Sequence, residues 1–137
     1  MFDFSIEILG GIVGGVVGAS VALYITKKKA EKKTLDVSEF PNETIEVELA
    51  MTDVVGWFQQ KMLQKGVHSP FVAQGNEVFE HILTPESSIK KEGYDTTFMG
   101  VYNEQTEEIE DFKIVFSKGR DKELQKMFGD KNLVVLE

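Results

Sequence analysis

The two histidines are the first residues to examine for chemistry, because imidazole binds metals and transfers protons near neutral pH. His81 follows Glu77 at i,i+4 spacing, so a helix would place both on one face, and His68 lies upstream in a predicted turn. These three residues form the polar site that the spacing suggests. The zinc motif H-E-x-x-H is absent, and we favour a solvated histidine on the polar side of a helix. We therefore assign no metal ligand and no cofactor.

Nucleophilic catalysis has equally little support in the residue types. The sequence contains no cysteine, and four serines lie beside proline, glycine or other turn residues: Ser69, Ser87, Ser88 and Ser117. Neither the G-x-S-x-G elbow nor the phosphate-binding G-x-x-x-x-G-K-[ST] loop occurs. We interpret the basic turn Ser117–Arg120 as a connection before a helix rather than as an anion site. No catalytic residue is assigned.

Acidic residues dominate the chain after its first 33 residues. Residues 34–137 carry 10 basic and 20 acidic side chains, a net charge of -10, which excludes the clustered positive charge that nucleic-acid binding needs. Five of the acidic side chains gather at one predicted hairpin tip: Glu104, Glu107, Glu108, Glu110 and Asp111. The spaced ligands of a calcium-binding loop are missing, so this cluster is interpreted as a solvated tip.

The first 33 residues have the opposite character and contain an apolar segment. Residues 8–26 form an uninterrupted run of 19 residues without charge. A helix of that length spans about 28 Å, close to the thickness of about 30 Å of a bilayer's hydrocarbon core. A cleaved signal peptide would have its positive charge before the apolar run, whereas here the lysines follow it. The sequence therefore predicts a single transmembrane helix.

The glycines of residues 8–26 recur at a spacing of four residues. Gly10, Gly14 and Gly18 repeat every four residues, and Gly11, Gly15 and Ala19 repeat beside them. One face of the helix would carry almost no side chains, so that another helix can approach closely and gain van der Waals and Cα–H···O contacts. We predict that this face packs against a second copy of the chain or against other transmembrane helices.

Five lysines set the expected orientation: Lys27, Lys28, Lys29, Lys32 and Lys33. Lysines near the end of a span favour the cytoplasmic side, and none precedes this segment. We expect a cell-membrane protein with its N-terminus outside, its lysines at the lipid headgroups and its remaining residues in the cytoplasm. A glycine-rich segment followed by lysines is similar to the N-termini of small YtxH-like envelope proteins. This resemblance covers about the first 33 residues and implies nothing for the rest.

Alternating and helical patterns predict the elements after residue 42. They are a strand over Thr44–Leu49, a helix from Thr52 or Asp53 to about Lys65, a helical stretch from Ser69 to Thr84, a hairpin of Thr96–Tyr102 and Glu108–Phe116, a helix over Asp121–Phe128 and a strand over Leu133–Leu136.

These elements give the expected organisation and fold class. Residues 1–26 are a short tail and the transmembrane helix, residues 27–41 a basic juxtamembrane linker, and residues 42–137 an acidic α+β domain. Without the helical stretch after Ser69, the order is βαββαβ, which is that of a ferredoxin-like sandwich. We therefore expect that topology with a helical insertion.

The anchor, the glycine spacing and the absence of catalytic motifs favour one function. The leading hypothesis is a single-pass membrane-anchored interaction or scaffold protein, which packs through its glycine face and presents an acidic cytoplasmic domain to a protein partner. Two alternatives belong to other classes. One is an oligomeric membrane-permeabilising effector regulated by its soluble domain, and the other is a small membrane-tethered enzyme.

Overall fold

The computed structural model describes residues 19–74, 79, 82–84 and 90–136. Within these residues the chain forms three helices and seven strands, an α+β domain. The helices are α2 (Ala19–Ala30), α3 (Met51–Gln59) and α4 (Lys122–Phe128). The strands are β1 (Leu35–Asp36), β2 (Asn42–Thr44), β3 (His68–Gln74), β4 (Leu83–Thr84), β5 (Asp95–Asn103), β6 (Glu108–Ser117) and β7 (Leu133–Val135).

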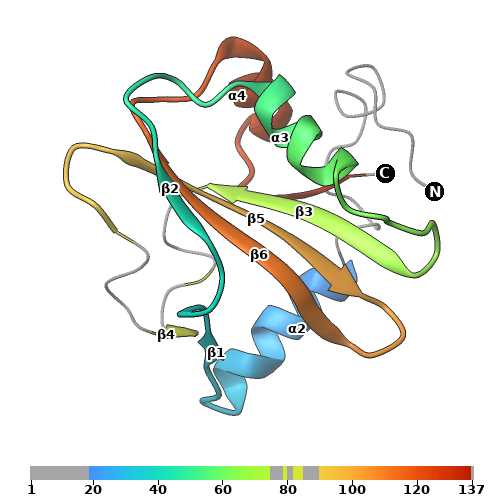
Figure 1. Cartoon of the computed structure of the whole chain (residues 1–137). Coiled ribbons are helices and arrows are strands. Elements are labelled where there is room, and N and C mark those ends of the chain that lie inside the picture. The colour runs from blue at the N-terminus through green and yellow to red at the C-terminus, as the bar shows by residue number, and fades with distance from the viewer. Residues whose placement is uncertain (1–18, 75–78, 80–81, 85–89, 137) are drawn as a thin grey trace.

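A five-stranded mixed sheet with the order β2-β6-β5-β3-β7 is the centre of the domain. Strands β5 and β6 form a long antiparallel hairpin, β3 pairs antiparallel with β5 and β7, and the short β2 lies parallel to β6 at one edge. Strands β1 and β4 form a separate parallel pair. Figure 1 shows α3 and α4 on one side of the large sheet, and α2 with β1 and β4 on the other.

Helices α3 and α4 cover the first face of the sheet. Their apolar sides pack with alternate residues of the strands into one cluster, which contains the buried side chains of Met51, Val54, Trp57, Phe58, Leu124, Met127 and Phe128 from the helices and Val72, Met99, Val101, Val115 and Val134 from the strands. The period of 3.6 in the helices and of two in the strands brings these residues to one layer.

Helix α2 helps to cover the second face. Its inner side places Val21, Tyr24 and Ile25 in a cluster that also contains Val37 from the chain after the helix. The sheet contributes the rings of Phe71, Phe98 and Phe112 to this cluster, and Phe79 joins them from the segment between β3 and β4. The contacting rings have centroids 5.0–6.3 Å apart. The described core therefore begins upstream of residue 42, where we expected the domain to start, and includes residues that we expected to form a span and a linker.

The C-terminal half of the domain largely follows the sequence prediction. The hairpin of β5 and β6, the helix α4 and the final strand β7 all form at the expected places. Asp121 is the N-cap residue of α4, and its carboxylate accepts a hydrogen bond from the backbone N–H of Leu124 at 2.9 Å.

The helical stretch predicted from Ser69 to Thr84 is wrong at both ends, because His68–Gln74 is strand β3 and Leu83–Thr84 is strand β4, while residues 75–78 and 80–81 lie outside the described residues. Four consecutive residues from Pro70 to Ala73 are buried, which is the pattern of a strand covered on both faces. Proline lacks a backbone N–H, and Pro70 lies where the pairing of β3 with β7 ends. Its carbonyl oxygen accepts a hydrogen bond from the N–H of Leu136, just beyond the last residue of β7, so no hydrogen bond inside this pairing is lost. With β3 between β5 and β7, the strand order is not that of the ferredoxin-like sandwich.

Two other predicted elements differ in their extent. The regular strand β2 ends at Thr44, and residues 45–49 continue beside β6 and the following turn through hydrogen bonds such as Ile45 N–H to the Phe116 carbonyl, 2.8 Å. Val47 points outward and is 66% exposed, so the expected alternation does not hold. Helix α3 begins at Met51 and ends at Gln59 rather than near Lys65, because the chain turns there to bury Leu63 while Met62 faces solvent.

The predicted transmembrane segment overlaps α2 by its last eight residues, 19–26, and its first part lies outside the described residues. Within the part of the chain that the structure describes, no helix combines the length and the apolar character needed to cross a membrane.

Gly100 is required where β3 and β5 pair, because it faces Phe71 across the strands. A Cβ atom at this position would lie 2.4 Å from Cζ of the Phe71 ring and 3.1 Å from the Asp111 carbonyl oxygen. We expect Gly100→Ala to lower the free energy of unfolding by about 1–3 kcal/mol through overpacking. Chemical denaturation measures the change.

The matched control for Gly100→Ala is Gly56→Ala in α3. Beyond the adjacent residues and the backbone of α3 itself, no atom lies within 4 Å of a Cβ placed at Gly56, and alanine favours a helix over glycine, so this variant should be unchanged or more stable by up to about 1 kcal/mol. An equal effect of the two substitutions would contradict the close packing of Phe71 on Gly100.

Candidate functional site

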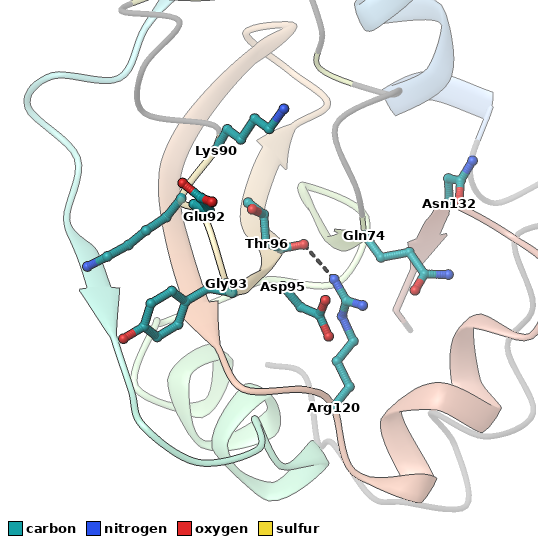
Figure 2. Close-up of a pocket in the computed structure, with 10 residues that line it drawn as sticks. Gln74, Lys90, Glu92, Gly93, Asp95, Thr96, Arg120 and Asn132 are labelled. Atoms are coloured by element: carbon teal, nitrogen blue, oxygen red, sulfur yellow. Dashed lines mark hydrogen bonds between the residues drawn. The ribbon is translucent and has the colours of Figure 1, made fainter.

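A pocket of about 540 Å³ opens at the end of the sheet where β3 stops and β5 starts. Figure 2 shows the side chains that surround it, with Arg120 reaching in from the turn before α4. Gln74 comes from the end of β3, Asp95 and Thr96 from the start of β5, and Asn132 from the segment before β7. Residues far apart in the sequence thus meet in one polar hollow, which is the candidate functional site.

Arg120 is the central side chain of this pocket. Its Nε donates a hydrogen bond to Thr97 Oγ1 at 2.8 Å, and Nη2 donates to the carbonyl oxygen of Thr96 at 2.5 Å. These bonds fix the guanidinium plane against the first residues of β5. Burial lowers the pKa of Arg120, and the negative charge of Asp95 opposes that effect. The arginine remains charged, and its charge is partly withdrawn from water.

The backbone around Arg120 is fixed from both directions. On one side, Leu49 forms a parallel bridge with Arg120, and the Asp121 N–H donates to the Leu49 carbonyl at 2.9 Å. On the other side, the two carboxylate oxygens of Asp121 accept from the N–H groups of Leu124, in α4, and Met51, in α3, at 2.9 and 3.1 Å. One carboxylate thus stabilises the N-termini of both helices and the turn that presents Arg120.

The remaining wall of the pocket is formed by the segment before β5. The Tyr94 ring packs under two ammonium groups, with Lys118 Nζ 3.9 Å and Lys91 Nζ 5.0 Å from its centroid. The Tyr94 hydroxyl donates to Glu46 at 2.6 Å, and this hydrogen bond raises the pKa of Tyr94. The wall is therefore held by contacts to β2 and to the residues that follow it.

The structure also brings together the basic and acidic clusters that the sequence contains. Tyr24 of α2 donates to Glu108 at 3.3 Å and packs edge-on against Tyr102 at 5.4 Å. A hollow of about 110 Å³ beside this contact is lined from α2 by Lys27 and Lys28 and from the hairpin by Glu107 and Glu108. Burial and Glu108 together raise the pKa of Tyr24. The hairpin tip is thus next to the lysine cluster in the folded chain.

His68 has a structural role in the described residues. The N–H of Gln64 donates to its Nδ1 at 2.8 Å, and its Nε2 lies 2.8 Å from the carboxylate of Glu110. Both ring nitrogens therefore have partners, which fasten the turn before β3 to the hairpin. Glu77 and His81 lie outside the described residues, so the polar site formed with them stays a prediction.

Some of the residues that we predicted to act at the membrane lie within the described part of the chain, and others lie outside it. Gly10, Gly11, Gly14, Gly15 and Gly18 lie outside the described residues, and Ala19 is the first residue of α2. Lys27, Lys28 and Lys29 form the last turn of α2, and Lys32 and Lys33 follow it. All of these lysines except the half-buried Lys28 are exposed, and helix packing in a membrane stays a prediction.

Sequence reasoning missed the Arg120 pocket. The turn Ser117–Arg120 was interpreted as a connection, and the arginine is the only one in the chain. The residues that line the pocket with Arg120 come from β3, the segment before β5, β5 and the segment before β7, which no sequence motif links. A lone arginine between a strand and a capped helix was the available signal.

Asp121→Ala tests the double cap. Removing the carboxylate leaves the N–H groups of Leu124 and Met51 without their partner, so we expect a loss of roughly 2–3 kcal/mol in the free energy of unfolding, more than one ordinary cap provides. Denaturant unfolding measures the loss, and the exposed Asp130→Ala is the matched control. A change below about 0.5 kcal/mol would refute the double role of Asp121.

The chain matches no protein-family model, no curated protein and no solved structure. Its function must therefore be inferred from its own residues, chiefly those of α2 and of the Arg120 pocket.

Proposed function

We propose that this chain is a membrane-anchored interaction protein, whose N-terminal apolar segment inserts in the bilayer and whose α+β domain is held at the cytoplasmic surface for a protein partner. The observation that carries the proposal is the solvent-facing side of α2. Leu23 is 69% exposed there, and Lys27 is exposed one turn further on, with Lys29 exposed on another side of the same last turn. An apolar side chain followed by ammonium groups is the composition of a membrane boundary.

The uncharged sequence that continues into α2 also supports insertion. Residues 8–18 carry no charge and lead directly into the helix. As a helix these 11 residues would extend about 16 Å, which is half of a hydrocarbon core. A complete span therefore needs residues 19–26 as well.

The proposal thus gives residues 19–26 two alternative apolar surroundings. In the described fold, Val21, Tyr24 and Ile25 lie against the sheet. In the spanning form, the first two turns of α2 leave the sheet and continue the transmembrane helix. The lysines at the end of α2 then lie at the headgroups instead of beside the acidic hairpin tip.

The glycine spacing supports association of the spanning form. A helix face formed by Gly10, Gly14 and Gly18 permits close backbone approach, which is the main source of helix association where lipid removes the hydrophobic drive. We propose a homo-oligomer or packing against other transmembrane helices, with membrane lipid as the surrounding partner.

Cysteine labelling tests the span and its orientation, and the chain has no native cysteine to interfere. In intact cells, Ser5→Cys should react with a membrane-impermeant maleimide, because the lysine asymmetry places the N-terminus outside. Ser38→Cys, at an exposed position after α2, should react only after permeabilisation. Equal protection of both sites in intact cells would exclude the span with its N-terminus outside.

Replacement of the central glycine tests association. Gly14→Leu should lower dimer formation in a transmembrane association assay at least several-fold, because a leucine there would separate the facing backbones. Val16→Leu is the control, since it adds bulk beside the glycine row rather than within it. Insertion should be unaffected in both variants, because leucine is favourable in hydrocarbon. Unchanged association of Gly14→Leu would show that the glycines do not form the interface.

A further inference from the structure

The Arg120 pocket contains two opposite charges that are not joined in an ion pair. Figure 2 shows the Asp95 carboxylate and the Arg120 guanidinium beside the same open space. Among the described residues, neither side chain lies within ion-pair distance of an opposite charge. The field of Asp95 acts on Arg120, but the two groups do not form a bridge.

The hydrogen bonds of Arg120 leave donors for a ligand. Arginine has five N–H donors in a planar fork, and the described contacts use Nε and one Nη group. Figure 2 shows the other Nη nitrogen on the side of Gln74, away from the Thr96 carbonyl. A carboxylate that enters the pocket therefore meets a guanidinium whose plane is already fixed, which lowers the entropy cost of binding.

Asp95 has the complementary position. It is exposed at the first residue of β5, and it lines the pocket together with Glu92. These two carboxylates would attract an ammonium group. Lys90 and Lys91 line the pocket as well, and the Lys91 ammonium lies at the Tyr94 ring and donates to Thr44 Oγ1, so the lining carries charges of both signs. The pocket is therefore not simply a basic site, although the charge of Arg120 is its most buried feature.

The size and lining of the pocket suit a small polar molecule. A volume of about 540 Å³ is within the range of about 300–1,000 Å³ of small-ligand sites. The Gln74 side chain is itself oriented, because its amide nitrogen donates to the Lys131 carbonyl at 2.7 Å. This hydrogen bond also fixes the orientation of the Gln74 amide oxygen, which can accept a hydrogen bond from a ligand.

We propose that this pocket binds a small zwitterion, with its carboxylate on Arg120 and its ammonium group on Asp95. An amino acid or a related amino carboxylate is the class of ligand. The two opposite charges of the ligand match Arg120 and Asp95, which have no ion-pair partner among the described residues, and each half of the ligand alone leaves one of these two side chains without a partner. This inference is independent of membrane anchoring.

Titration of the full chain in detergent micelles tests the proposal. The probes are glycine and 4-aminobutanoate as zwitterions, acetate and methylammonium as the separate halves, and inorganic phosphate as a competing anion. Amide NMR shifts of Thr96 and Thr97 report binding beside Arg120. At least one zwitterion should bind tenfold or more tightly than acetate, methylammonium or phosphate.

Two substitutions separate the charges. Asp95→Asn should lower the affinity for the zwitterion to that for acetate, while acetate binding is unchanged or stronger. Arg120→Gln should abolish binding of both, and if this variant does not fold, Asp95→Asn decides alone. Glu39→Gln, at an exposed position outside the pocket, should have no effect. Phosphate or acetate binding as tightly as the zwitterions, no saturable shift, or unchanged affinity in Asp95→Asn would overturn the proposal.

Discussion

Burial of the sheet on both faces is the constraint on which the fold depends. All residues of β5 after Asp95 are buried, so the strand contributes side chains to two separate cores. One core requires α3 and α4, and the other requires α2 together with Val37, Phe79, Ile82 and Leu83. Neither face can be left to water without exposing a continuous apolar surface. Helix α2 is therefore a layer of the domain.

This constraint gives the apolar N-terminal segment a dual character. Burial of Val21, Tyr24 and Ile25 contributes roughly 1.5–3 kcal/mol for each side chain in water. Lipid chains are as apolar as a protein core, so moving the same side chains from the sheet to a bilayer changes this contribution little. The sheet face that α2 covers would then need another apolar cover, so the balance depends on that cover as well as on the polar contacts. Tyr24 donates a hydrogen bond to Glu108, and Lys27 and Lys28 of α2 lie beside the acidic hairpin in the described fold, whereas they would lie beside lipid headgroups in the proposed spanning form.

Where local patterns decide the structure, the sequence was sufficient. The alternation of β5 and β6 and the short helix that ends at Phe128 are local signals, and both elements formed as predicted. The segment after His68 was mispredicted because Ser-Pro is typical of a helix start, while its neighbours β5 and β7 are distant in sequence. Burial by partners on both sides overrode the local propensity. The same distance hid the Arg120 pocket, whose walls come from four segments.

The docking of α2 could not be predicted for a related reason. The uncharged residues 19–26 of α2 suit either lipid or the face of a sheet. Only the aromatic face formed by β3, β5 and β6 shows that they pack on the sheet in the described fold. The lysines that follow were interpreted as a membrane boundary, which stays a prediction, and the acidic tip that lies beside them in the fold is almost eighty residues away in sequence.

The reactivity of a cysteine at position 22 tests the central claim, that residues 19–26 exchange the sheet for the bilayer. Ala22 is exposed in the described fold, so Ala22→Cys should react readily with a water-soluble maleimide in the absence of lipid. In protein bound to vesicles, we predict that its reactivity falls to that of Ile12→Cys, because both thiols then lie in hydrocarbon. Reactivity in bound protein as high as that of Ser38→Cys would contradict the account, since α2 would then have remained on the sheet.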